Sequence, residues 1–385
     1  MSETYDCIVL GVGGFGSGAL YHAAKRGFRV LGLEQFEVAH DRGSSHGDTR
    51  IIRQAYFEHP DYVPLLRQAY SLWHELEAET GDKLYRQQGL LTVGPADGSA
   101  VPGTRLAART HGLQIDELSQ ADMLARFPGY ALPEGMAAVF EPVAGSLAVE
   151  RCVGAHVQRA VARGAVLNTE EAVQSWSSDG HRVQARTNRG EYEAGALIVT
   201  AGPWAGQMLA NLGLRLRVLR KPVFWFPVMQ QTLYSADAGA PLFFYEMPAG
   251  EFYGFSSFDG QTLKAAEHTG GDQVEDPLHV DRQLRPDDAT SVASFLQQCL
   301  PGVGVAPVRY SVCMYTKTPD CHFIVDRHPQ FANVVFGAGF SGHGFKFTSV
   351  LGKTLAELAL DGSTQSPVEF LGLNRGGLRA SPSSS

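Results

Sequence analysis

A glycine-rich loop near the beginning of the chain constrains the fold more than any other segment. Gly11, Gly13 and Gly16 stand between an apolar run at residues 7–10 and a helix-forming stretch, and Glu34 ends the next apolar run. The first glycine permits a tight turn, the second lets the backbone approach a pyrophosphate, and the third lets the helix pack on the strand. The pyrophosphate then lies at the amino end of the helix, where unpaired N–H groups favour an anion, and the acidic side chain can bind a ribose hydroxyl. This segment predicts a dinucleotide-binding domain.

The loop does not decide between NAD and FAD, because both dinucleotides use the same fingerprint. Its order of strand, turn, helix and strand begins a parallel sheet with a right-handed crossover. The 385 residues exceed what one hydrophobic core usually supports, so a second lobe is expected. Turn pairs between residues 173 and 194 predict a small antiparallel meander, and the aromatic and β-branched stretch from 218 to 258 predicts an antiparallel sheet in the second lobe.

Helical spacing of apolar residues predicts the main helices. A long amphipathic helix is expected within residues 61–79, and a helix start is expected near Ser119. Further helices are expected at residues 147–163, 287–299 and 348–360.

Two clusters of small and basic residues fit a bound planar ligand. The first, residues 43–53, joins Gly and Ser to one His and to Arg50 and Arg53. Its arginines could hold a carboxylate or an anionic ring, although a solvated basic turn explains the segment equally well. The second, residues 337–347, combines four glycines with His343 and Lys346, as expected where backbone wraps closely around a ligand.

Composition argues against several other classes. The formal charge is −8, and acidic and basic residues are mixed along the chain. This distribution does not predict a basic surface that would bind nucleic acid or an anionic membrane. No apolar run is long enough to span a bilayer, and the acidic amino terminus is unlike a signal peptide. Five scattered cysteines favour a reducing compartment, so cytoplasm is expected.

The cysteines and histidines near the carboxyl end carry no clear signal by themselves. Cys313 and Cys321, with the neighbouring histidines, lack the paired short spacings of zinc ligands, so we expect no metal. A Cys–His nucleophile pair fits the residue types, but no local arrangement shows activation. A lone cysteine in a strand is most often simply buried.

Taken together, the motifs resemble one known family, that of monomeric sarcosine oxidase, N-methyltryptophan oxidase and pipecolate oxidase. The resemblance covers essentially the whole chain and rests on the order and spacing of the motifs, since any one of them would be weak. The motifs are the glycine loop, the stretch from Gly43 to Arg53, Phe252-Tyr-Gly-Phe255, Leu263-Lys264 with His268, Cys313-Met-Tyr315-Thr, and Phe340-Ser-Gly-His-Gly-Phe-Lys346.

The resemblance implies an α/β fold with two domains. An FAD-binding domain of the doubly wound, glutathione-reductase-like type is interleaved with a substrate domain whose antiparallel sheet covers the flavin. The expected boundaries are residues 1–85, 145–215 and 310–375 for the FAD-binding domain, residues 86–144 and 216–309 for the substrate domain, and residues 376–385 for a flexible tail.

The resemblance also implies the cofactor and how it is held. Cys313 falls on the cysteine that this family bonds through sulfur to the 8α-methyl group of the flavin, so covalently attached FAD is the expected cofactor. The other residues expected around FAD are Gly11, Gly13, Gly16, Glu34, Ser44, Thr49, Val173, Gly342, His343 and Gly344.

Two sets of cations receive roles from the resemblance. Arg53 and Lys346 fall on the pair that binds the substrate carboxylate, and Lys264 falls on the lysine that activates oxygen. A cation beside the flavin lowers the energy of superoxide and of anionic reduced flavin as charge develops there. Two further cations, at a distance from this lysine, can bind the substrate carboxylate so that the reacting C–H bond faces the flavin.

Other residues match positions around the amine. Arg50, His268 and Tyr253 are expected to act in catalysis, while Tyr315 and Phe244 are expected to contact the substrate. If His268 and Tyr253 flank the nitrogen, they favour a neutral amine, and removal of a proton by a general base becomes unnecessary.

The implied reaction is oxidation of a secondary amino acid to an imine, with O₂ reduced to H₂O₂. Sarcosine, giving glycine and formaldehyde, is the favoured substrate, and N-methyltryptophan or a cyclic amino acid such as pipecolate is the alternative. Two other classes stay open at this stage, an NAD-dependent dehydrogenase and a flavin-binding module without catalysis. The expected partners are a small amino acid and O₂, with no nucleic acid and no membrane, and the chain is expected to act as a monomer.

Overall fold

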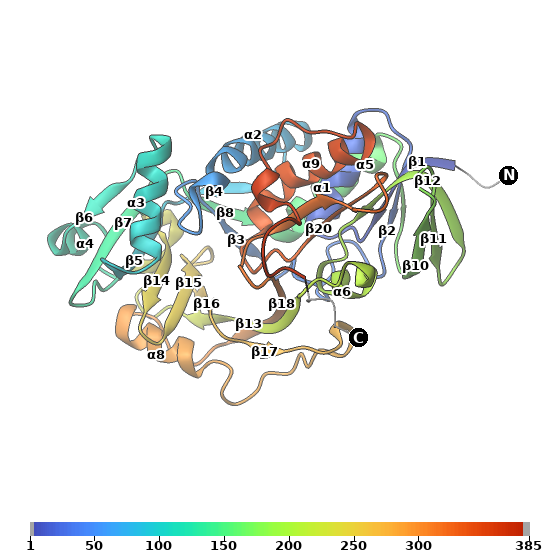
Figure 1. Cartoon of the computed structure of the whole chain (residues 1–385). Coiled ribbons are helices and arrows are strands. Elements are labelled where there is room, and N and C mark those ends of the chain that lie inside the picture. Colours follow the sequence, from blue (N-terminus) through green and yellow to red (C-terminus); the bar gives the residue numbers. More distant parts are fainter. Residues whose placement is uncertain (1–3, 380–385) are drawn as a thin grey trace.

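Two large sheets organise the chain, and the segments that join them cross back and forth several times (Figure 1). The structure is a computed structural model that describes residues 4–379. Within these residues the first sheet has eight strands, the second has nine, and a third has three.

The first sheet is built around β1 (Thr4–Leu10), which lies parallel to β12 (Glu191–Val199) on one side and to β2 (Val30–Leu33) on the other. Successive side chains of a strand face opposite sides. Accordingly, Cys7 and Val9 belong to one hydrophobic core, whereas Ile8 and Leu10 belong to another. This burial of both faces explains the continuous apolar run before the glycine loop.

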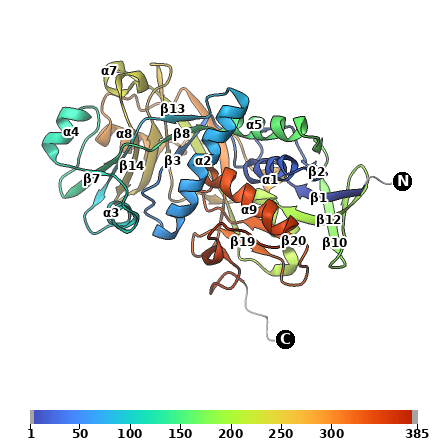
Figure 2. The ribbon, with the colours of Figure 1, turned by 90° about the horizontal axis from the view of Figure 1, so that it is seen from above.

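Helices cover one face of this sheet, and α1 (Gly14–Lys25) packs against both α5 (Val149–Ala162) and α9 (Thr348–Leu360). Figure 2 shows α1 and α9 side by side over the strands. The approach of α1 and α9 is so close that a Cβ on Gly18 would lie 2.5 Å from the carbonyl oxygen of Thr348. Helix α2 (Val63–Thr80) extends this helical layer toward the second sheet.

The remaining strands of the first sheet confirm the predicted meander. β10 (Val173–Ser178), β11 (Val183–Thr187) and β12 are antiparallel neighbours. The other members are β9 (Val166–Asn168), β19 (Ile324–Arg327) and β20 (Val334–Ala338).

The second sheet is mostly antiparallel, as the aromatic stretch predicted. Its strands run in the order β17-β13-β16-β15-β14-β5-β7-β6, with β18 paired to β13 and with β14 parallel to β5. The strands are β5 (Leu90–Pro95), β6 (Asp116–Leu118), β7 (Met136–Glu141), β13 (Arg217–Pro227), β14 (Leu242–Met247), β15 (Gly250–Phe255), β16 (Thr262–Glu267), β17 (Asp272–Gln273) and β18 (Arg309–Lys317). Helix α8 (Thr290–Cys299) covers this sheet, with the ring of Phe295 stacked on Phe252.

The predicted helices are present, but some begin later than expected and one helix was missed. The helix expected at residues 287–299 begins at Thr290. The helix expected from residue 147 begins at Val149, because β8 (Gly145–Ala148) pairs with β3 (Thr49–Ile52) and with β4 (Tyr85–Gln87) in the third sheet. Helix α3 (Ala100–His111) was not predicted, although its apolar side packs on β5. The helix start at Ser119 is correct, since α4 (Gln120–Arg126) begins there with a capping box closed by Asp122.

Two observations bear on the expected domain boundaries. β18 pairs with β13 along its whole length, so the strand that carries Cys313 extends the second sheet, although residues 310–375 were expected in the FAD-binding domain. Leu378 is buried, and its carbonyl oxygen accepts a hydrogen bond from the backbone N–H of Arg215 at 2.8 Å. Leu378 of the predicted tail is therefore packed on the protein, whereas its neighbours are exposed and residues 380–385 lie outside the described range.

Candidate active site

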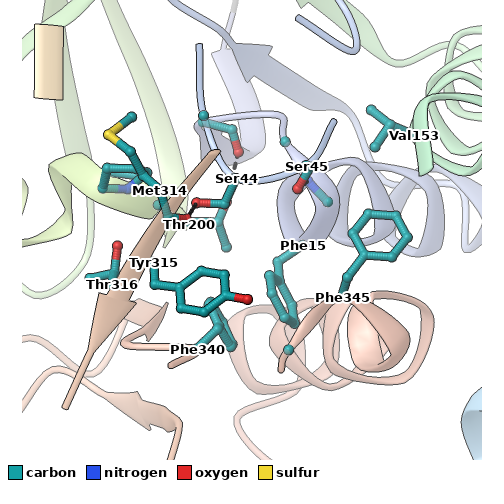
Figure 3. A pocket seen from close by; sticks show the side chains of 18 of the residues that line it. Phe15, Ser44, Ser45, Val153, Thr200, Met314, Tyr315, Thr316, Phe340 and Phe345 are labelled. Carbon is teal, nitrogen blue, oxygen red and sulfur yellow. Dashed lines mark hydrogen bonds between the residues drawn. The ribbon is translucent and has the colours of Figure 1, made fainter. Parts of the chain in front are cut away.

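A large cavity lies between the two sheets. Residues of both clusters that the sequence singled out, residues 43–53 and 337–347, line it. Figure 3 shows the side chains of Phe15, Tyr315, Phe340 and Phe345 around it, although these residues are far apart in the sequence. The glycine loop and Glu34 line one part of the cavity, and Arg53, His268 and Lys346 line another. The fold therefore joins the two clusters that the sequence singled out.

The three glycines differ in what a side chain would meet. Gly11 has a φ of 82°, and a Cβ on Gly16 would lie 1.8 Å from the carbonyl oxygen of Gly11, so both positions require glycine. A Cβ on Gly13 would meet nothing within 4 Å, because this residue borders the cavity at the start of α1. The loop thus leaves an open cradle at a helix amino terminus with no acidic residue in its first turn, which fits a pyrophosphate.

Glu34 is buried and is held in a fixed position at the cavity wall. Its carboxylate accepts hydrogen bonds from the backbone N–H groups of Val12, at 2.8 Å, and Phe36, at 3.1 Å. Val173 lines the cavity as well. A fixed carboxylate at the end of β2 fits the predicted contact with a ribose hydroxyl.

Cys313 is buried on β18, and two basic side chains adjoin its sulfur. The Arg50 guanidinium donates a hydrogen bond to Sγ at 3.3 Å, and Nδ1 of His46 lies 3.8 Å from it. Burial alone would raise the pKa of this thiol, but the nearby His46 and Arg50 outweigh burial and lower the pKa to about 6. At neutral pH the thiolate, which is the nucleophilic form, therefore predominates.

The other buried cysteines show the opposite behaviour. Burial raises the pKa of Cys7 and of Cys152 above the usual value for a thiol, and at Cys152 it outweighs the opposing effect of Arg151. The surroundings of Cys313 therefore differ from those of the other buried cysteines, a difference that the sequence alone did not reveal.

Lys264 lies on β16 and is turned away from the main cavity. Its Nζ donates hydrogen bonds to the carbonyl oxygens of Gly47, at 2.5 Å, and Thr49, at 2.9 Å. Burial, followed by repulsion from Arg50, lowers the pKa of this ammonium to about 7. A second, smaller pocket, which Thr49 and Trp225 also line, reaches Lys264 from the other side.

Arg53 and Lys346 both line the main cavity and are buried. One terminal nitrogen of the Arg53 guanidinium, Nη2, binds both carboxylate oxygens of Glu58 at 2.7 Å. The other, Nη1, has no hydrogen-bond partner among residues 4–379. Nζ of Lys346 donates to the carbonyl oxygen of His343 at 2.8 Å, and burial, followed by repulsion from Arg53, lowers the pKa of Lys346 to about 7. This arrangement leaves donors free for an incoming carboxylate.

Neutral polar groups and aromatic rings line the wall between the two cations and β18. The hydroxyl of Tyr315 lies 3.4 Å from Nδ1 of His268, and the ring of Phe244 adjoins His268 with 6.3 Å between centroids. Burial lowers the pKa of His268 to about 3 and raises the pKa of Tyr253 and of Tyr315. At neutral pH these groups are uncharged, so they can hydrogen-bond a neutral amine without removing a proton from it.

The second glycine cluster fits tightly against the cavity. Gly342 has a φ of 86°, and a Cβ there would lie 2.3 Å from the Tyr315 ring. His343 is held from both sides, because Nδ1 receives the Tyr56 hydroxyl at 2.5 Å and Nε2 donates to the carbonyl oxygen of Cys321 at 2.9 Å. A Cβ on Gly344 would lie 2.6 Å from the side chain of Phe340.

The structure brings together most, but not all, of the residues expected at the site. Ser44 lines the cavity and donates to the carbonyl oxygen of Met314 at 2.6 Å. Gly16 packs helix against strand behind the cavity, and Thr49 adjoins the second pocket. The sequence analysis did not identify Tyr56 and Glu58 as site residues. Their position shortly after Arg53 in the sequence was the signal that could have indicated them. Within the described part of the chain, no group of three or more His, Cys, Asp or Glu residues could hold a metal ion.

Comparisons with known proteins agree with this geometry. The sequence model of the FAD dependent oxidoreductase family matches residues 6–358. Monomeric sarcosine oxidase of Bacillus sp. (strain B-0618) is 42% identical over 99% of this chain and 98% of its own, and N-methyl-L-tryptophan oxidase of Yersinia pestis (strain Pestoides F) is 35% identical over 95% and 97%. The chain belongs to this family. The solved structure of NikD, an unusual amino acid oxidase, superimposes with a TM-score of 0.85 at 26% identity over 96% of this chain and 98% of that one.

Membership of this family has two consequences. The protein is a flavin-dependent amine oxidase, and its dinucleotide is FAD rather than NAD. The doubly wound fold with a second, antiparallel sheet is thereby confirmed. Among residues 4–379, no helix is long and apolar enough to cross a membrane.

Proposed function

We propose that this amine oxidase acts on sarcosine, with N-methyltryptophan or a cyclic amino acid such as pipecolate as the alternative. The observation that carries the proposal is the pair formed by Arg53 and Lys346, two buried cations with donors to spare in the same cavity as the neutral His268. A carboxylate can bind the cations while the adjoining amine lies among uncharged groups. The 42% identity to a monomeric sarcosine oxidase supports the small substrate.

In the proposed reaction the methyl C–H bond of sarcosine breaks with loss of a hydride, and the nitrogen loses a proton as the C=N bond forms. Bound FAD would supply the two-electron acceptor, and O₂ would finally take up the two electrons and two protons as H₂O₂. Water then hydrolyses the imine to glycine and formaldehyde. Arg53 and Lys346 contribute orientation, which is worth most when the reacting atoms are held close together.

Lys264 has the proposed task of assisting O₂. Its ammonium is fixed by Gly47 and Thr49 on the side away from Arg53 and Lys346. A preorganised cation stabilises the negative charge that develops as O₂ accepts an electron. With Arg50 beside Cys313 and Tyr253 beside His268, these residues complete the proposed catalytic set.

The covalent attachment to Cys313 is also a proposal. The low pKa of the thiol and the Arg50 and His46 contacts support it. Attachment would join the Cys313 sulfur to the 8α carbon; the thiol hydrogen and one methyl hydrogen would be lost as two protons and two electrons, which O₂ would take up to give H₂O₂. Cys313→Ala is expected to release its FAD on denaturation, whereas the unaltered chain should stay fluorescent on a denaturing gel.

Substrate choice follows from the wall beside the amine, where Phe244 and Leu90 line the cavity. The deciding experiment is an anaerobic panel of sarcosine, N-methyltryptophan and pipecolate, with the flavin absorbance as readout. Sarcosine should bleach the flavin fastest per unit concentration. Faster bleaching by either larger amino acid would move the assignment to that substrate.

The proposed setting is a monomer in the cytoplasm, with the substrate amino acid and O₂ as its only partners. The similarity to bacterial monomeric sarcosine oxidases supports a monomer, and the free state of all five cysteines fits a reducing compartment. We also retain the expected division into an FAD-binding and a substrate domain, with β18 of the second sheet at their junction.

A further inference from the structure

A long connection crosses the edge of the main cavity between β17 and α8. This connection, residues 274–289, is here called the strap, and in Figure 1 it runs along the bottom of the molecule. Leu278 of the strap lines the cavity but is 58% exposed, so the strap forms part of the cavity mouth. The strap packs through the partly buried Val274 and Val280 on the hydrophobic core that contains Ile8 and Leu10.

Arg282 ties the strap to two segments on which the cofactor site depends. Its Nη1 donates to the carbonyl oxygens of Asp41, at 2.8 Å, and Val312, at 2.9 Å, and its Nη2 donates to the carbonyl oxygen of Arg42 at 2.7 Å. Asp41 and Arg42 directly precede the loop of residues 43–45, which lines the cavity. Val312 directly precedes Cys313.

A second arginine fixes the strap on both sides of residue 282. Arg220, which is buried on β13, donates to the carbonyl oxygens of Asp281 and Gln283, each at 2.7 Å. It also binds the carboxylate of Asp288 at 2.7 and 2.8 Å. The backbone that carries Arg282 is thus anchored to the second sheet, so Arg282 holds other segments against a fixed strap, with two of its hydrogen bonds on residues 41–42 and the third on Val312.

We propose that Arg282 is a latch that fastens the loop of residues 43–45 and the strand of Cys313 to the fixed strap once FAD is bound, and that it is a positioning residue for both segments. FAD enters the cavity while these contacts are open. Once they form, residues 41–45 and residue 312 are held in one arrangement by a single guanidinium. The inference rests on FAD occupying the main cavity, and it adds a residue that touches neither the substrate nor the reacting atoms.

The latch predicts how fast FAD escapes when no bond retains it. In a Cys313→Ala background, Arg282→Met should raise the rate at which FAD is released after dilution by at least about tenfold, since three charge-assisted hydrogen bonds are lost. The appearance of free FAD fluorescence measures this rate. Arg285→Met is the matched control, because Arg285 lies on the same strap and binds only the exposed Asp272 and Asp281 through its side chain. Its release rate should stay within about twofold of the parent.

A second readout does not depend on the attachment. In the otherwise unaltered holoenzyme, Arg282→Met should accelerate amide hydrogen exchange at residues 41–45 and leave β1 and β12 unchanged. If Cys313→Ala kept its FAD after denaturation, the attachment proposal would fail, while this exchange measurement would still test the latch. Where Arg282→Met does not fold, Arg282→Lys decides, with release at least about threefold faster expected. Unchanged release and exchange, or equal changes in Arg285→Met, would overturn the proposal.

Discussion

Lys264 and Lys346 are two buried lysines with the same intrinsic chemistry and different surroundings. Each donates to backbone carbonyl oxygens, and burial together with a neighbouring arginine lowers the pKa of each to about 7. Lys346 lines the main cavity beside Arg53, whereas Lys264 is bound by Gly47 and Thr49 and adjoins a separate pocket. Burial lowers the pKa of both lysines, and the position of each relative to the cavity is the basis of the different role that we propose for it.

The largest expected effect separates the two lysines by the oxygen reaction. Lys264→Met should slow reoxidation of chemically reduced flavin by about 10²- to 10³-fold, because the preorganised cation is lost. Anaerobic reduction by sarcosine should change far less. Mixing the reduced protein with O₂ in a stopped-flow instrument gives the rate. Lys221→Met is a control, since Lys221 is also buried in the second sheet and binds the carbonyl oxygen of Thr269; its reoxidation should be near normal.

The next effect concerns the other lysine. Lys346→Met should raise the sarcosine concentration needed for half-maximal anaerobic reduction by about 10- to 100-fold, since a hydrogen bond between charged groups contributes about 1.5–3 kcal/mol. The same variant should reoxidise at the normal rate when it is reduced without amine. Unchanged sarcosine dependence would remove Lys346 from the carboxylate site.

The pH dependence of carboxylate binding also distinguishes Lys346 from Lys264. Lys346 binds a carboxylate only when protonated, and a bound carboxylate raises its pKa. The affinity for a carboxylate should therefore be highest below about pH 7. Above this pH it should fall by up to about tenfold per pH unit, until the pH exceeds the pKa that Lys346 has in the complex. Titration with propionate, which has no amine, measures this directly. Lys346→Met should abolish the dependence, and Lys264→Met should preserve it; the reverse pattern would exchange the two roles.

The smallest expected effect tests the partner of Arg53. Glu58 occupies one nitrogen of the guanidinium that the substrate carboxylate would use. Glu58→Gln should therefore tighten propionate binding by about two- to fivefold, the range of a weak ion pair, and lower the melting temperature slightly. Binding isotherms and a thermal scan measure the two changes. Weaker propionate binding would mean that Glu58 orients Arg53 instead of competing for it.

The parts of the protein differed in how far the sequence predicted them. The glycine loop could be predicted because the positions of Gly11 and Gly16 leave no room for a side chain or require a positive φ, and because Glu34 follows at the end of the next strand. Helix α9 was readable from its apolar spacing, whereas α3 was missed because it packs with small residues and contains Gly103 and Pro102. Local patterns report local packing well.

The site depended on contacts between distant segments, which no local pattern reports. The thiol of Cys313 is acidic because Arg50 and His46, more than 260 residues away, reach it through the fold. The resemblance to a family supplied the expected role of Lys264, but its place outside the main cavity required the structure. Tyr56 was missed because its partner, His343, is distant in the sequence, whereas Glu58 is close to Arg53 in the sequence and was overlooked.

The division of work between the two lysines is tested most directly by one double-mixing experiment. Unaltered protein, Lys264→Met and Lys346→Met are each mixed anaerobically with sarcosine and then with O₂, and the flavin absorbance is followed through both steps. The account predicts a crossed pattern, with Lys346→Met impaired only in reduction and Lys264→Met impaired only in reoxidation. Equal impairment of both steps in either variant would contradict it.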